Sequence, residues 1–225
     1  MKVKTKPLEN GPAGGRMGRP PKDLAAQVDE RILDAARRLF LERGLSGVSV
    51  EEIAREAHAS KGTIYARFAT KEALFAAIAI RNEANVREGF KRGPPSAGTI
   101  EERLFEVATG ILKHLLTSDS IDFMRLAVSE VRRFPDLAKV GKMMRERGAQ
   151  SVAAVFREVV QSKQFKDFPG FAPERLAKTT QSFLDLVVTP LLMRAVFGED
   201  VKSLRAQIRS HVESSVSFFL DACRR

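Results

Sequence analysis

The stretch SVEEIAREAHASKGTIYARF, which spans residues 49–68, decides how the N-terminal part of the chain folds. It opens with Ser49 and Glu52, a capping box in which each side chain binds a backbone amide at the start of a helix. Ser60 is a second residue of the kind that caps helices, so another short helix is expected to run from there to Phe68. Two short helices joined by a tight turn predict a helix-turn-helix.

The second helix of this motif is expected to leave small and cationic side chains on its outer face. Ile53, Ala54, Ala57 and Ile64 are the apolar residues that would pack the two helices together. A recognition helix needs short residues where its backbone approaches base edges, and it needs donors at its margins because phosphate contacts fix the register. The short residues are Ser60, Gly62 and Thr63, and the donors are Lys61, Tyr65, Arg67 and Lys71.

Helical patterns continue on both sides of this motif. Apolar residues at helical spacing precede it as far as Gly44, which suits the left-handed end of a helix. Thr70 is placed to cap a longer helix beginning at Lys71, and Thr99 with Glu102 forms a second capping box. Pro135 and Pro190 interrupt later helical patterns, and the second proline is expected to kink its helix. No segment alternates with period two for long enough to be a strand, so we predict an all-α protein of about nine helices.

Composition excludes several classes of protein. Hydrophobic residues make up 44% of the 225 residues, which excludes a wholly disordered chain. The single cysteine, Cys223, excludes a disulfide scaffold and fits a reducing compartment. No apolar run approaches the roughly 20 residues that span a bilayer. We therefore expect a soluble cytoplasmic protein.

Positive charge is concentrated at the N-terminus. The chain has 38 basic and 28 acidic residues, a net charge of +10, and residues 1–24 carry six basic and two acidic side chains. Residues 25–80 carry eight of each. The first segment is rich in Pro and Gly and is expected to be a disordered basic arm. In Gly18-Arg19-Pro20-Pro21-Lys22, proline would hold the chain extended, so that Arg19 and Lys22 can reach a minor groove. The alternative is a tail that only improves solubility.

Residues 31–78, RILDAARRLFLERGLSGVSVEEIAREAHASKGTIYARFATKEALFAAI, resemble the DNA-binding domain of TetR-family transcriptional regulators. The resemblance implies a homodimer that binds a double-stranded DNA operator, with Ser60, Thr63 and Tyr65 on the DNA and Lys71 on a phosphate. It also implies release of the operator by a ligand. The set of residues expected to face DNA is completed by Ser49, Lys61, Gly62 and Arg67. We accordingly expect a DNA-binding domain at 25–80 and a ligand-binding and dimerisation domain at 81–225.

Two positions depart from the family pattern, and a second resemblance covers the C-terminal part. His58 stands in the turn where the family usually has glycine, so it is expected to adopt a positive φ. Ala66-Arg67 replaces an aromatic or histidine pair, which suggests a different base preference, with Arg67 on guanine or phosphate. The segment RLAVSEVRRFPDLA, residues 125–138, resembles the AefR-like subgroup of TetR regulators.

The C-terminal helices offer a candidate site for a small effector. Apolar residues from four helices would converge there, with His114 as a polar anchor. The expected lining is Phe105, Ile111, His114, Leu115, Met124, Val128, Phe156 and Phe183. The plainer alternative is that these apolar residues form ordinary core and that His114 is a half-buried histidine.

The pattern of polar residues does not indicate an enzyme or a metal protein. The three histidines lack ligand-spaced neighbours, and no paired carboxylates or Ser/His/Asp set stands out, so neither catalysis, a cofactor nor a metal is expected. A basic protein lying on an anionic membrane is the alternative class, but residues 25–80 are neutral overall. We predict a ligand-responsive regulator, a repressor, that is released from DNA by a small, mainly apolar effector. The last helices, near 173–197 and 201–223, are expected to form the dimer interface.

Overall fold

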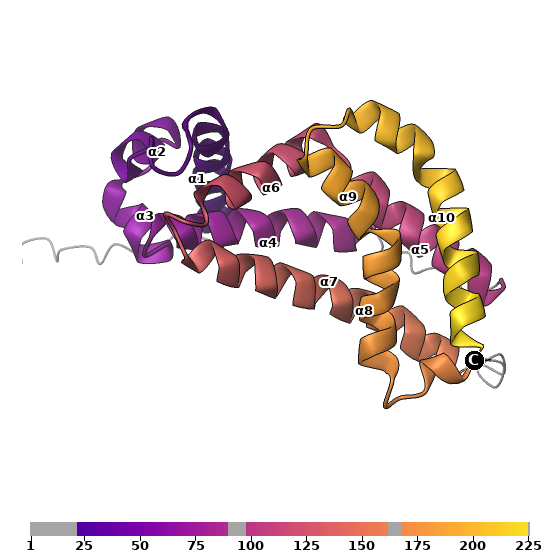
Figure 1. The fold of residues 1–225 in the computed structure, drawn as a ribbon. Coiled ribbons are helices and arrows are strands. Elements are labelled where there is room, and N and C mark those ends of the chain that lie inside the picture. Colours follow the sequence, from indigo (N-terminus) through magenta and orange to yellow (C-terminus); the bar gives the residue numbers. More distant parts are fainter. Residues whose placement is uncertain (1–21, 90–97, 162–167, 225) are drawn as a thin grey trace, which may run out of the picture.

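The computed structural model describes residues 22–89, 98–161 and 168–224 (Figure 1). Within these ranges every regular element is helical, which confirms the all-α prediction. The elements are α1 (Lys22–Arg43), α2 (Val50–Glu56), α3 (Lys61–Arg67), α4 (Lys71–Gly89), α5 (Ile100–Leu115), α6 (Ser118–Glu130), α7 (Asp136–Val160), the 3-10 helix η2 (Pro169–Phe171), α8 (Leu176–Val187), α9 (Thr189–Val196) and α10 (Val201–Cys223).

The helix near Pro190 differs from the prediction. A kinked single helix was expected, but α8 ends at Val187 and α9 begins at Thr189, with Pro190 in its first turn. Proline has no amide hydrogen to donate to the preceding turn and its ring clashes with a carbonyl there, whereas it fits the first turn of a new helix. The described ranges therefore hold ten α-helices in place of about nine.

The first helix begins earlier than predicted. Helix α1 begins at Lys22, so the last three residues of the predicted 1–24 arm belong to a helix. Arg19, the other arm residue expected to contact DNA, lies outside the described residues.

Local sequence signals place the helix ends as predicted. The Ser49 hydroxyl accepts from the Glu52 amide at 3.2 Å, and the Glu52 carboxylate accepts from the Ser49 amide at 2.8 Å. An equivalent capping box opens α5. Gly44 ends α1 with a φ of +73°, and a Cβ built there would lie 2.6 Å from a carboxylate oxygen of Glu130. The positive φ therefore favours glycine here, whereas the Glu130 side chain could move to make room for a Cβ.

Helices α1 to α4 enclose a small core of their own. Its fully buried residues include Ile32, Phe40, Ile53, Ile64 and Leu74. The same cluster includes Phe123 of α6 and Leu137 of α7. Phe123 stacks on Phe75 of α4, with ring centroids 4.1 Å apart. The N-terminal helices are therefore joined to the rest of the chain by a packed contact as well as by α4.

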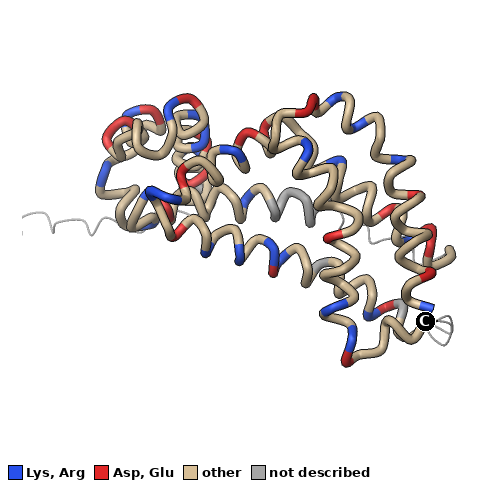
Figure 2. Tube along the Cα trace, viewed as in Figure 1, with Lys and Arg blue, Asp and Glu red and all other residues tan. Residues whose placement is uncertain are grey.

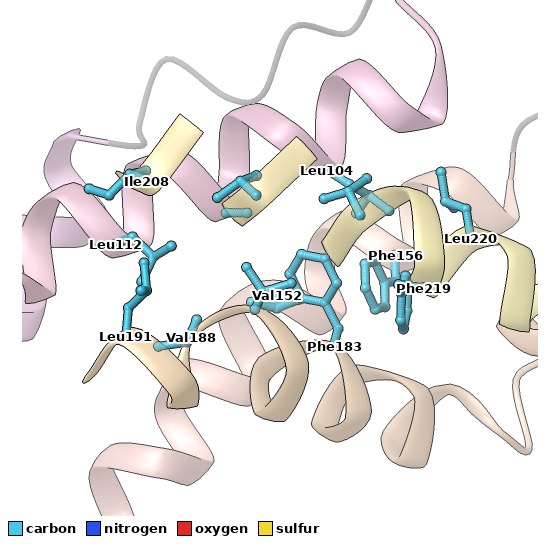
Figure 3. Packing of buried hydrophobic residues seen from close by; sticks show 14 of the residues in the cluster. Leu104, Leu112, Val152, Phe156, Phe183, Val188, Leu191, Ile208, Phe219 and Leu220 are labelled. Atoms are coloured by element: carbon cyan, nitrogen blue, oxygen red, sulfur yellow. The ribbon is translucent and has the colours of Figure 1, made fainter. Parts of the chain in front are cut away.

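The larger core lies between α5, α7, α8 and α10 (Figure 3). Phe156 of α7 stands at its centre, with ring centroids of Phe171, Phe183 and Phe219 at 5.0, 5.5 and 5.9 Å. Aromatic pairs at these separations add to the gain from burial alone. This core fixes the position of α10.

The two cores lie at opposite ends of the molecule. Figure 1 shows α1–α3 at one end and α10 at the other, with α4 running from the first group into the body between α6 and α7. Across the described ranges, no helix combines the length and apolar character that crossing a bilayer requires.

Candidate nucleic-acid interface

Helices α2 and α3 form the predicted helix-turn-helix. Ile53, Ala54 and Ala57 are buried against Ile64, which is fully buried. In the turn, His58 has a φ of +48°, as expected of a residue standing where glycine is usual. The four apolar positions thus fix which face of α3 points inward.

The first turn of α3 carries a hydroxyl pair. Ser60 caps the helix by accepting from the Thr63 amide at 2.9 Å, and the two side-chain oxygens lie 2.8 Å apart. Both residues are therefore held in a fixed orientation at the helix start. The Tyr65 side chain, two residues further on, is 47% exposed although it is large and mostly apolar. A fold alone gives no reason for a tyrosine at that position.

Gly62 leaves the backbone of α3 uncovered. A Cβ built there would meet only the Ser60 hydroxyl, at 3.8 Å, so the fold has room for a side chain. Glycine inside a helix costs about 0.5–1 kcal/mol relative to alanine. Close approach of the backbone to another molecule is the physical reason that would justify that cost.

The cations of α3 have partners inside the protein. The Lys61 ammonium contacts a carboxylate oxygen of Glu51 on α2, and the Arg67 guanidinium contacts that of Asp29 on α1. Lys61 also lies over the Tyr65 ring, 5.8 Å from its centroid. Neither acidic partner was singled out from the sequence, where the equal numbers of acids and bases in residues 25–80 were the available signal.

Lys71, expected to contact a phosphate, has partners inside the protein. Its ammonium donates to the carbonyl oxygens of Leu45 at 2.6 Å and Val48 at 3.1 Å, in the loop between α1 and α2. It also lies 5.6 Å from the centroid of the Phe134 ring. A cation bound by two carbonyls and an aromatic face stabilises that loop, so the geometry assigns Lys71 a structural role in this conformation.

Replacing Lys71 by alanine is therefore expected to lower the free energy of unfolding by about 1–3 kcal/mol, because two carbonyls lose a charged donor. Chemical denaturation measures this. Lys142→Ala, which removes an exposed lysine 3.8 Å from Glu146, is the matched control and should change stability by less than about 0.5 kcal/mol. Wild-type stability combined with a flatter salt dependence of DNA binding would instead favour the phosphate role.

Ser49 is also used by the fold, and Lys22 stands at the start of α1. The Ser49 hydroxyl donates a hydrogen bond to the Glu52 carboxylate at 2.9 Å and accepts one from the Glu52 amide. Both bonds belong to the capping box. A surface hollow of about 300 Å³ lies between α1 and α3, lined in part by Ala25, Ser60 and Thr63.

The residues expected to line an effector site do not share one environment. Phe156 and Phe183 are fully buried against other rings, so they belong to the body core. Val128 is 65% exposed, which contradicts a place in an enclosed cavity. The buried residues of α6 are Ile121, which packs into the larger core, and Phe123, which packs into the N-terminal core. The remaining apolar members are partly buried at the edge of the core: Phe105, Ile111, Leu115 and Met124.

His114 is half-buried on α5, near the end of the helix. Burial lowers the pKa of its imidazole below the usual 6.5, so the ring is neutral at neutral pH. Its carbonyl accepts from the Ser120 hydroxyl at 3.5 Å. Within the described ranges, no group of three or more His, Cys, Asp or Glu side chains is placed to hold a metal.

Comparisons with known proteins agree with this arrangement. The family model for bacterial regulatory proteins of the tetR family matches residues 32–78. The model for the C-terminal domain of AefR-like transcriptional repressors matches residues 102–225, more than half of the chain. The chain belongs to the TetR family.

Individual relatives align with nearly the whole length of this TetR-family protein. The transcriptional repressor Rv1474c of Mycobacterium tuberculosis is 29% identical over 196 residues, covering 87% of this chain and 96% of that protein. A solved TetR-family structure from Mesorhizobium loti superposes with a TM-score of 0.73 at 24% identity, covering 88% of this chain and 97% of the other, which shows the shared fold. The flavonoid-responsive regulator FrrA is 28% identical with a TM-score of 0.64, covering 88% and 97%. The chain is a TetR-family transcriptional regulator with an AefR-like C-terminal domain.

Proposed function

We propose that the protein is a ligand-responsive repressor that binds a near-palindromic operator as a homodimer and leaves it when a small, mainly apolar molecule binds the body. The observation that supports DNA binding is the outer face of α3. There the backbone at Gly62 is not covered by a side chain, and Thr63 and Tyr65 lie next to it. These side chains would read base edges in the major groove.

The dimer would form through the end of the molecule that is farthest from α3. Large apolar side chains are exposed on α9, at its C-cap and on α10: Met193 by 42%, Phe197 by 82% and Phe218 by 67%. Exposed apolar groups of this size favour association. A two-fold axis through α8 and α10 would present two recognition helices to successive major grooves, about 34–36 Å apart. Sedimentation of the protein at micromolar concentration tests this, and a stable folded monomer would contradict it.

We propose that the arm increases the affinity for DNA by contacting the minor groove. Deleting residues 1–21 removes five basic and one acidic side chain but leaves α1 whole. Binding to all duplexes should weaken, and the slope of log Kd against log salt should fall by about 0.9 for each phosphate that the arm no longer neutralises. Preference for A·T pairs beside the site should fade, because Arg19 no longer reaches a narrow minor groove. Fluorescence anisotropy with flanking-sequence variants measures both, and unchanged values would leave a solubilising tail.

The effector site is proposed at the half-buried edge of the body core, around Ile111, His114 and Met124. These residues offer apolar surface with one neutral imidazole, which suits a mainly apolar molecule with a polar group. FrrA, a regulator of similar length and fold, is described as flavonoid-responsive. Flavonoids are therefore the first compounds to test.

A thermal-shift screen with flavonoids and other apolar compounds tests the switch. A ligand that releases DNA must bind the DNA-free conformation more tightly, and the operator must then weaken the ligand by the same factor. We expect a rise in Tm for the free protein and a smaller rise when operator duplex is present. Equal affinity with and without DNA would contradict the switch but would leave DNA binding intact.

A further inference from the structure

The two cations of α3 are both held by carboxylates of neighbouring helices. Glu51 of α2 holds Lys61 at the first position of the recognition helix, and Asp29 of α1 holds Arg67 at the last. Each pair lies at one margin of α3. A phosphate that uses either cation must therefore share it with, or take it from, a carboxylate that is already in contact with it.

The same arrangement extends over the N-terminal helices. Figure 2 shows basic and acidic residues interspersed along α1–α3. Two further arginines of α1–α3 contact acidic side chains of α2, Arg38 with Glu56 and Arg43 with Glu52. Arg81 of α4 contacts Glu30 and Asp34 of α1. Residues 25–80, with eight basic and eight acidic side chains, therefore offer DNA little net attraction.

The Lys61–Glu51 pair is well exposed, and the Arg67–Asp29 pair is partly exposed, with the contacting Oδ1 atom of Asp29 buried. Lys61 and Glu51 have side-chain exposures of 52% and 58%, and Arg67 and Asp29 have 29% and 40%. Ion pairs in such positions contribute little to stability, so DNA can break them without unfolding the domain. The hydrogen bond that Lys61 donates to the Glu51 carboxylate lowers the pKa of Glu51 and raises the pKa of Lys61, so both groups stay charged near neutral pH.

We infer that Glu51 and Asp29 are specificity-determining residues that compete with DNA phosphates for Lys61 and Arg67. This inference rests on the proposed reading of DNA by α3. Non-specific binding depends on cations that replace the counterions of phosphates, so cations already paired within the protein weaken it. The contacts that Thr63 and Tyr65 would make with base edges do not require a cation to leave its carboxylate. The carboxylates therefore reduce binding to random DNA more than binding to the preferred site.

The test compares Glu51→Gln and Asp29→Asn with wild type on a random-sequence duplex of about 30 base pairs. Each variant should bind that duplex about two- to fivefold more tightly. The slope of log Kd against log salt should steepen by up to about 0.9, because one cation becomes free to release a counterion from DNA. On a duplex selected for tight binding the gain should be smaller, so the ratio of specific to non-specific affinity falls.

Asp34→Asn is the control, because it removes the same charge from one of the two acidic partners of Arg81, which lies on α4. Its effect on DNA binding should be smaller than that of Glu51→Gln. Lys61→Gln should cost more affinity in the Glu51→Gln background than in wild type. Equal gains for Asp34→Asn and Glu51→Gln, or no coupling to Lys61, would overturn this inference alone. No salt-dependent binding to any duplex would overturn the proposed function as well.

Discussion

Alanine in place of Tyr65 is expected to weaken binding to the preferred duplex by about 1–3 kcal/mol, or about 5- to 150-fold, if the side chain contacts a base edge. Binding to a random duplex should change much less. The side chain is 47% exposed, so the fold should keep nearly all of its stability. Titration of both duplexes by anisotropy, with circular dichroism as a check on folding, measures the difference.

Two companion variants sharpen this result. Tyr65→Phe keeps the ring and removes the hydroxyl, so it separates hydrogen bonding from stacking. Thr63→Ala should weaken specific binding by a similar amount, with a small loss of stability because Thr63 lies 2.8 Å from the capping Ser60 hydroxyl. If Tyr65→Ala weakened both duplexes equally, Tyr65 would be a phosphate contact in place of a base reader.

Alanine in place of Phe156 is expected to lower the free energy of unfolding by about 3–5 kcal/mol. The side chain is fully buried and its ring lies within 5.9 Å of three others, so its removal leaves a cavity that four helices cannot close. Chemical denaturation followed by circular dichroism measures the change.

Val128→Ala is the control for Phe156→Ala, because Val128 was expected at the same effector site but is 65% exposed. It should change stability by less than about 0.5 kcal/mol. If Phe156→Ala were instead tolerated and the variant lost its response to apolar compounds, Phe156 would line a ligand cavity after all.

Local signals predicted the parts of the fold that depend on neighbours in sequence. The Ser49–Glu52 capping box, the left-handed Gly44 and the burial of Ile53 and Ile64 all follow from short-range geometry. Even the positive φ of His58 could be anticipated from its place in the turn. These features locate the recognition helix without any tertiary information.

The environment of each charged side chain could not be predicted, because it depends on helices that meet only in three dimensions. Lys71 has the right place in sequence for a phosphate ligand, yet its ammonium binds the Leu45 and Val48 carbonyls, 26 and 23 residues away. The carboxylates that hold Lys61 and Arg67 come from α2 and α1. Charge counts indicated a neutral domain but not which cations were paired.

Helical periodicity likewise could not separate core from a binding cavity. Phe156 and Val128 both have the residue type expected of an effector site, but one is fully buried among rings and the other faces solvent. Spacing assigns a residue to one face of its own helix, whereas the partner of that face is set by how ten helices pack. The residues of the effector site were therefore the hardest to predict from the sequence.

Selection of bound duplexes from a random pool tests the central claim most directly. If two copies of α3 read DNA across a two-fold axis, the recovered sequences should share two inverted half-sites, with centres about one helical turn, or 10–10.5 base pairs, or a whole multiple of that apart. Thr63→Ala and Tyr65→Ala should each relax the same positions in both halves. Recovery of sequences with no shared motif, or with a single unrepeated one, would contradict the account.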